Sequence, residues 1–251
     1  MTIYTVANGK GGSTKSTTAA EVVASLTRLG RTVLALDLDR QGSLTSRLGA
    51  GRDFEVSAVA ADVLTGDATV VEAAVASPTV PRAWLIAGTK DIEKIEHSPE
   101  VMAALGPQLR QQATGWDDVV IDTPGSLGVA TLAALVAADV IIAAVACEVE
   151  SYDQVAELED EIHRRVARVN AGQQLNWIIP TRYDARRNLD REVLELLGEK
   201  YPGRVTTPVH ESVVVKESYI AGIPASMYSP GSTVSNDYIE ALHPVLSGGE
   251  R

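Results

Sequence analysis

Residues 1–17, MTIYTVANGKGGSTKST, decide the fold of this chain. The apolar run Ile3–Ala7 predicts a buried strand, and the segment Ser16–Leu29 predicts a helix. A glycine-rich turn between a strand and a helix aims backbone N–H groups at an anion, and the helix dipole adds positive potential. Lys15 can then reach the β- and γ-phosphates of a nucleotide, and the Ser16 hydroxyl can ligate Mg²⁺. The stretch therefore predicts a phosphate-binding loop, with a tight glycine turn beside an exposed lysine as the alternative.

Two positions set this loop apart from the pattern Gly-x-x-x-x-Gly-Lys-Ser. Thr14 stands where the pattern has glycine. If that position requires a positive φ, a β-branched residue is strained there, and nucleotide affinity or loop shape suffers. The second is an additional lysine, Lys10, near the start of the loop.

Apolar runs alternate with helical segments along the rest of the chain. The further predicted strands are Val33–Asp37, Ala83–Ala87, Asp118–Asp122, Val140–Ala146, Leu175–Pro180 and Arg204–Pro208. The further predicted helices are Pro99–Gln112, Val129–Ala137, Asp153–Val169, Asn188–Lys200 and Asn236–Leu246. Most strands lack alternating polar positions, which is typical of strands buried on both faces. The order predicts an α/β fold with a doubly wound, mostly parallel sheet flanked by helices, of the P-loop NTPase type.

Length and composition exclude several classes of protein. The 251 residues contain no repeat or linker, so we expect a single domain over residues 1–246 and a short polar tail over 247–251. The single cysteine, Cys147, excludes a disulfide framework or a Cys-rich metal site within one chain and is expected to be a buried small hydrophobe. A net charge of −11 argues against a protein that coats nucleic acid through bulk charge. The apolar stretch 129–147 has Asp139 at its middle, which favours a helix, a turn and a strand over a membrane span.

Several motifs resemble those of one family. Lys10-Gly11-Gly12-x-x-Lys15-Ser16-Thr17 resembles the deviant Walker A motif of the ParA/MinD class of ATPases. Residues 33–43, VLALDLDRQGS, look like the second motif of that family, Asp-x-Asp-Pro-Gln-Gly-Asn, with Arg40 in place of proline. Residues 119–128, VVIDTPGSLG, look like its Walker B segment, and residues 147–148, 180–186 and 216–222 are similar to the ParA branch. The resemblance covers nearly the whole chain.

The resemblance implies an ATPase that uses ATP and Mg²⁺. It implies a phosphate cradle at Gly11, Gly12, Ser13, Thr14, Lys15, Ser16 and Thr17, an adenine site near Thr181, Arg182, Pro208 and His210, and a metal site of Ser16, Asp37 and Asp122. The catalytic residues would be Lys10, Lys15 and Asp39. Asp39 would position or activate the attacking water, and Lys10 would contact the nucleotide of the partner subunit in an ATP-sandwich homodimer.

Simpler roles remain open for these residues. Asp37 and Asp39 are alternatively solvated carboxylates at a strand end, and Asp122 a turn cap. Lys10 would then only add charge beside the phosphates. Arg40 frees φ in its loop and can pair with a nearby aspartate.

The resemblance also implies non-specific binding of duplex DNA and a ParB-type adaptor protein that triggers hydrolysis. Two arginine groups could bind DNA, or could pair with acidic residues on their own helices. They are Arg164, Arg165 and Arg168, and Arg182, Arg186, Arg187 and Arg191. A counter-signal is the segment 210–216, in which relatives often carry arginines but only Lys216 is basic here.

Membrane binding is not expected, because the C-terminal segment has no amphipathic helix suited to it. We expect a cytoplasmic protein that is nucleoid-associated if it binds DNA, and that segregates or positions a plasmid or chromosome. The alternative is a nucleotide-gated scaffold, or a positioner of a protein assembly, with slow hydrolysis and little DNA binding.

Overall fold

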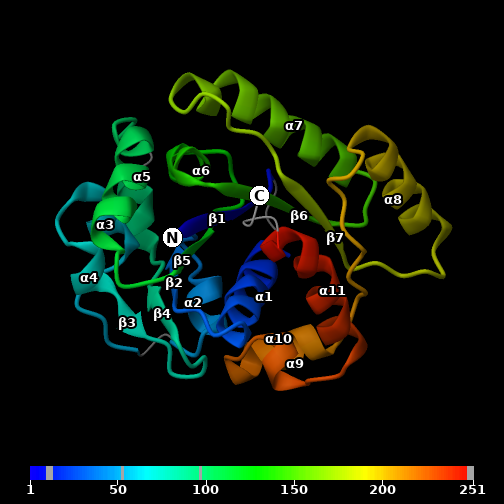
Figure 1. Ribbon diagram of the computed structural model, residues 1–251, viewed down its shortest axis with the longest axis horizontal. Helices are drawn as coiled ribbons and strands as arrows, with labels where there is room; N and C mark the ends of the chain where they lie inside the picture. Colours follow the sequence, from blue (N-terminus) through cyan, green and yellow to red (C-terminus); the bar gives the residue numbers. More distant parts are fainter. Residues whose placement is uncertain (10–13, 52–53, 96–97, 248–251) are drawn as a thin grey trace.

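A parallel sheet with one antiparallel edge strand forms the centre of the computed structural model, which describes residues 1–9, 14–51, 54–95 and 98–247 (Figure 1). Within these residues the strand order is β3-β4-β2-β5-β1-β6-β7. The strands are β1 (Thr2–Ala7), β2 (Val33–Asp37), β3 (Val75–Ala76), β4 (Ala83–Ile86), β5 (Asp118–Asp122), β6 (Val140–Ala146) and β7 (Trp177–Thr181). Only β3 runs antiparallel, against β4. The predicted doubly wound α/β fold is confirmed.

Helices cover both faces of the sheet (Figure 1). They are α1 (Lys15–Arg28), α2 (Ser43–Arg47), α3 (Ala60–Thr65), α4 (Val70–Ala73), the 3₁₀ helix η1 (Lys90–Ile95), α5 (Val101–Gln112), α6 (Val129–Ala137), α7 (Ser151–Arg164), the 3₁₀ helix η2 (Val166–Arg168), α8 (Asn188–Lys200), α9 (Val214–Ala221), α10 (Ala225–Tyr228) and α11 (Thr233–Ser247). Within β2, Val33 and Ala35 face the core that contains α1 and α11, while Leu34 and Leu36 face the core that contains α5 and α6. This alternation explains why the strands read as continuous apolar runs.

The apolar stretch 129–147 folds as α6 followed by β6, as predicted. Asp139 lies between the two elements, where its Oδ2 accepts the Ile3 N–H at 2.9 Å and its Oδ1 accepts a hydrogen bond from Arg110 at 2.7 Å. Among the described residues, no helix has the length and apolar character needed to span a membrane.

The predicted strand Arg204–Pro208 is wrong as a sheet element. The segment runs beside β7 but makes one isolated bridge, Ile178 with Val205, and a second bridge, Tyr183 with His210, follows just beyond both segments. Pro180 in β7 and Pro208 in the segment have no N–H to donate, so a continuous ladder cannot form. The segment still lies against the end of β7, because the Val209 N–H donates to the Pro180 carbonyl at 2.8 Å.

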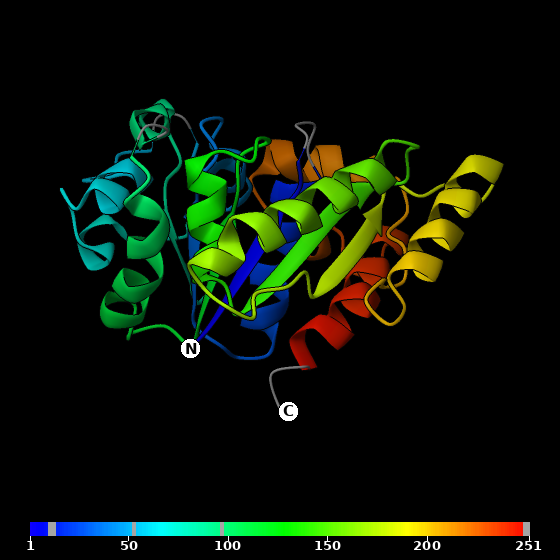
Figure 2. The same cartoon turned by 90° about the horizontal axis from the view of Figure 1, so that it is seen from above.

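The parallel strands bring the predicted site residues to one edge of the sheet. Asp122 is in register with Val6 of β1 and with Asp37 of β2, so both aspartates stand where the chain leaves the sheet. Figure 2 shows β1, β6 and β7 side by side, with the N-terminus at the edge of the sheet opposite to the carboxyl ends of these strands. Ligands of such sheets bind at the carboxyl ends of the strands.

Candidate nucleotide site

The carboxylate of Asp37 holds the loop that follows β2. Its Oδ2 accepts hydrogen bonds from the backbone N–H and the hydroxyl of Thr45, both at 2.8 Å, and its Oδ1 accepts the Asp39 N–H at 3.0 Å. Burial raises the pKa of Asp37 to about 6, against the lowering effect of these bonds. Asp37 is therefore engaged with its own loop, and its predicted role near the metal remains a prediction.

Glycines keep the Asp39 loop in a tight turn. The Gly42 N–H donates to the Asp39 carbonyl at 2.9 Å, and the Gln41 N–H donates to the Asp39 carboxylate at 2.9 Å. Gly42 has φ 61°, which favours glycine. A Cβ on Gly88, which follows β4, would lie 2.6 Å from the Asp39 carbonyl oxygen. Only glycine at that position lets the two loops approach so closely.

Arg40 does not pair with an aspartate of its own loop. Its guanidinium forms an ion pair with Glu93 of η1, and both side chains are exposed. The charge introduced at this position is thus compensated from outside the loop, away from Asp37 and Asp39.

Asp122 is a buried carboxylate without hydrogen-bond partners among the described residues. Both of its oxygens are inaccessible to solvent and unbonded. Burial raises the pKa of Asp122 well above its usual range, and the charge of Asp37 adds to this, while the nearby Ser16 hydroxyl and Lys15 ammonium lower it. A buried carboxylate in this state requires a cation or a proton. Its arrangement with Ser16 matches the oxygen ligands that Mg²⁺ prefers.

Ser16 and Lys15 begin α1, next to Asp122. Lys15 is only 3% exposed, and burial lowers the pKa of its ammonium while the charges of Asp122 and Asp39 raise it. Among the described residues, no group of three His, Cys, Asp or Glu side chains could hold a metal ion. A magnesium ion here would therefore take its other ligands from phosphate oxygens and water.

A cavity of about 240 Å³ opens beside the start of α1. Thr14 and Thr17 line its end near the phosphate loop. Four residues at the end of β7, just after it or beside it line the cavity as well: Thr181, Arg182, Val209 and His210. Three of the predicted adenine residues thus line one cavity, while Pro208 lies beside it in the chain. His210 is fixed there, because its backbone N–H and its Nδ1 both bond Asp237, at 3.0 and 2.9 Å.

The comparisons with known proteins agree with this geometry. The chain matches the family AAA_31, described as an AAA domain, over residues 1–175. It is 30% identical to the chromosome partitioning protein ParA of Caulobacter vibrioides over 98% of this chain and 94% of that protein. It is also 29% identical to the sporulation initiation inhibitor protein Soj of Bacillus subtilis, over 98% and 99% of the two chains.

The chain belongs to the ParA/MinD-type P-loop ATPases. A crystal structure of cobyrinic acid a,c-diamide synthase from Mycobacterium smegmatis, with a bound ATP analog and magnesium, superposes with a TM-score of 0.82 at 28% identity, covering 100% of this chain and 96% of that one. The predicted cofactors of this ATPase, ATP and Mg²⁺, are confirmed.

The substitution of threonine for glycine in the loop of this ATPase causes no backbone strain. Thr14 has φ −81° and ψ −18°, an ordinary right-handed conformation, and it precedes α1 directly. Its carbonyl accepts the Thr18 N–H at 2.8 Å, as in a regular first helical turn. The expected cost of a β-branched residue is therefore not found. Lys10, Gly11, Gly12 and Ser13 lie outside the described residues.

The first arginine group of this ATPase lies far from the nucleotide site. Arg164 and Arg165 come at the end of α7, which runs back toward the amino edge of the sheet, and η2 with Arg168 follows. Arg164 pairs with Asp160 at 2.9 Å, and Arg165 pairs with Glu161 at 3.1 Å. The alternative reading, a solvated helix face with local pairs, describes these two arginines, while Arg168 forms no ion pair with any described residue.

The second arginine group lies at the carboxyl edge, but carboxylates neutralise most of it. Arg182 pairs with Glu148 at 3.1 Å and Glu211 at 3.5 Å, and Arg186 pairs with Asp184 at 2.8 Å. Arg187 pairs with Asp184 and Glu211, and Arg191 bonds the side chain of Asn188. Lys216 of α9 makes no ion pair within the described ranges. The DNA-binding residues therefore remain predictions. Among the described residues, the candidate cations without a carboxylate partner are Arg168, Arg191 and Lys216.

Several residues of the site have no clear signal in the sequence. Thr45 holds Asp37 from a helix that the sequence pattern did not predict, and its hydroxyl also accepts the Gly88 N–H at 3.1 Å. Arg47 and Tyr238 line the cavity from α2 and α11. Gly88 alone has a usable signal, since it stands just beyond the end of a parallel strand.

Proposed function

We propose that this protein is a ParA-like ATPase that positions a large cargo by switching between a monomer and an ATP-sandwich homodimer. The proposal depends above all on Asp122, a buried carboxylate near Lys15 and Ser16 whose oxygens have no hydrogen-bond partner in the part of the chain that the structure describes. A site of this kind is built for a divalent cation and the phosphates that accompany it. The family relationship to partition proteins supports the coupling of that site to the segregation or positioning of a plasmid or chromosome.

The chain's own residues supply positioning and charge rather than covalent chemistry. Lys15 neutralises charge that develops on the transferred phosphoryl group. Asp39 lies half-buried at the start of its turn and orients the attacking water, accepting its proton as the bond to phosphorus forms. Bound Mg²⁺ adds further neutralisation of phosphate charge. Turnover is slow in isolation and is stimulated by a ParB-type adaptor.

If the cargo is bound through DNA, only a few basic side chains without ion pairs among the described residues are available for it. Five of the seven candidate arginines are paired or bonded to a neighbouring carboxylate, namely Arg164, Arg165, Arg182, Arg186 and Arg187. We therefore propose weak, non-specific DNA binding that needs two subunits to present Lys216 twice. The same pairing favours a second candidate function, in which the ATP-bound dimer positions a protein assembly and binds DNA little.

Retention on duplex DNA tests the first function against the second. Purified protein is passed over non-specific DNA with ATP, with ADP and without nucleotide, each at low and moderate salt. We expect retention only with ATP, falling steeply as salt rises because the contacts are to phosphates. Lys216→Gln should reduce retention. Arg164→Gln is the control, because it removes the same charge from a residue that is already paired with Asp160. No retention in any state would favour the positioner of a protein assembly.

Lys10→Ala should prevent the ATP-dependent dimer while leaving ATP binding measurable. The family resemblance places this lysine against the nucleotide of the partner subunit, so its removal acts on association. Sedimentation of the variant with ATP and Mg²⁺ should give a monomer. A dimer that persists would remove Lys10 from the interface.

A further inference from the structure

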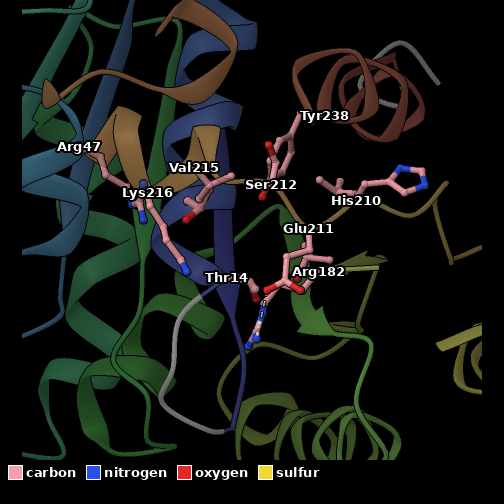
Figure 3. A pocket seen from close by; sticks show the side chains of 12 residues that line it. Thr14, Arg47, Arg182, His210, Glu211, Ser212, Val215, Lys216 and Tyr238 are labelled. Atoms are coloured by element: carbon pink, nitrogen blue, oxygen red, sulfur yellow. Dashed lines mark hydrogen bonds and ion pairs between the residues drawn. The ribbon is translucent and has the colours of Figure 1, made fainter. Parts of the chain in front are cut away.

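Arg47 occupies an unusual position in the cavity beside α1. It is the last residue of α2, and it lines the same cavity as Thr14, Thr17 and Tyr238. Figure 3 shows Arg47 and Lys216 on one side of the cavity, with Tyr238 and His210 on the other. Arg47 thus places a permanent cation beside the space next to the phosphate loop.

The guanidinium of Arg47 has hydrogen-bonding capacity that the described residues do not use. Its Nε is buried without a hydrogen-bond partner, and the side chain forms no ion pair within that part of the chain. Its carbon Cζ lies 4.8 Å from the centre of the Tyr219 ring. That contact stabilises the cation through the ring face and leaves the buried Nε–H group in need of an acceptor. Buried donors without acceptors are costly and are rare in native proteins.

Other charges around the cavity do not supply that acceptor. Glu211 is the acidic residue of its lining, and its carboxylate pairs with Arg182 and Arg187 at 3.5 Å. Burial lowers the pKa of Arg47, whereas the charges of Tyr238, Tyr219, Asp122 and Glu21 raise it. The acceptor is therefore expected from a ligand.

We propose that Arg47 is a specificity-determining residue of this ATPase, which donates hydrogen bonds to the acceptor edge of the nucleotide base. The inference rests on the proposed nucleotide-binding function. The phosphates bind at the start of α1, where Thr14 and Thr17 lie, so the part of the nucleotide that reaches the adjoining cavity is its ribose and base. Purine rings carry nitrogen acceptors along their edge, and a guanidinium presents donors in a rigid fork that suits them.

Calorimetric titration with two ligands separates base binding from phosphate binding. ATP carries the base, and inorganic tripolyphosphate does not; both are titrated in the presence of Mg²⁺. We expect Arg47→Met to weaken ATP binding by about tenfold or more, as for loss of a charge-assisted hydrogen bond, and to change tripolyphosphate binding by less than about twofold. Arg47→Lys should fall between, because it keeps the charge but loses the fork.

Arg28→Met is the matched control, since Arg28 lies at the other end of α1, where it bonds Ser226 at 3.3 Å. It should change neither affinity. Thermal unfolding without ligand monitors the folding of each variant, and Arg47→Lys carries the test if Arg47→Met unfolds. Unchanged ATP affinity, or equal losses for ATP and tripolyphosphate, would overturn the inference. If the unaltered protein binds neither ATP nor tripolyphosphate, the proposed function fails as well.

Discussion

Asp39→Ala is expected to lower the rate of ATP hydrolysis by about 100-fold or more while the ATP-dependent dimer persists. The structural reason is that the loop does not depend on this side chain. The Asp39 N–H donates to the Asp37 carboxylate, and the Asp39 carbonyl accepts from the Gly42 N–H. Both bonds use backbone atoms of Asp39, which the substitution retains. Only the bond from the Gln41 N–H to the Asp39 carboxylate is lost. Phosphate release measures turnover, and sedimentation measures the dimer.

Two further variants sharpen this test. Asp39→Asn retains an acceptor for the Gln41 N–H but removes the charge, so it should lose turnover as Asp39→Ala does. Glu93→Gln breaks the neighbouring ion pair of Arg40 and should leave turnover within about twofold, because that pair is exposed. Normal turnover in Asp39→Ala would exclude Asp39 from catalysis.

Lys15→Ala is expected to abolish measurable hydrolysis and to weaken ATP binding strongly. Loss of one group that stabilises transition-state charge costs about 100- to 1,000-fold in rate. Lys15 is buried, and its charge interacts with Asp122 and Asp39, so its removal also leaves the Asp122 carboxylate without the cation that stabilises its charge. Calorimetric titration with ATP measures the loss of binding, and thermal unfolding without ligand measures any loss of stability from the Asp122 carboxylate.

Lys200→Ala provides the comparison for Lys15. Lys200 lies over the ring of Tyr152, 4.3 Å from its centre, at the end of α8 and outside the nucleotide site. Its removal should leave ATP affinity and turnover unchanged. Retained hydrolysis in Lys15→Ala would mean that this loop does not bind the reacting phosphates.

The sequence predicted the strands and helices that have a clear local pattern of apolar residues. β2, β5, β6, α6 and α8 have the predicted bounds, since each is a continuous apolar run or a strongly periodic segment. The short elements α2, α3, α4, η1, α9 and α10 were not predicted, because four to eight residues carry too little periodicity. The edge strand β3 has only two residues and forms through its pairing with β4. The segment 204–208 was predicted as a strand in error, because Pro180 and Pro208 come to lie beside each other only in the folded chain and leave the ladder without two N–H donors.

Within the site, the sequence located the charged residues but not their partners. Lys15, Ser16, Asp37, Asp39 and Asp122 converge because parallel strands end at one edge. The hydrogen bonds from Thr45 to Asp37 were not predictable, because they depend on α2, a short helix that follows the Asp39 loop. The conformation of Thr14 was likewise open, since a residue type does not reveal the φ that its position requires.

Sedimentation of the unaltered protein with ATP and Mg²⁺, with ADP and Mg²⁺, and without nucleotide tests the central claim most directly. The claim is that the site at the carboxyl edge binds ATP and thereby joins two subunits. We predict a dimer with ATP and a monomer in the other two states. The same mass in all three states would contradict the account.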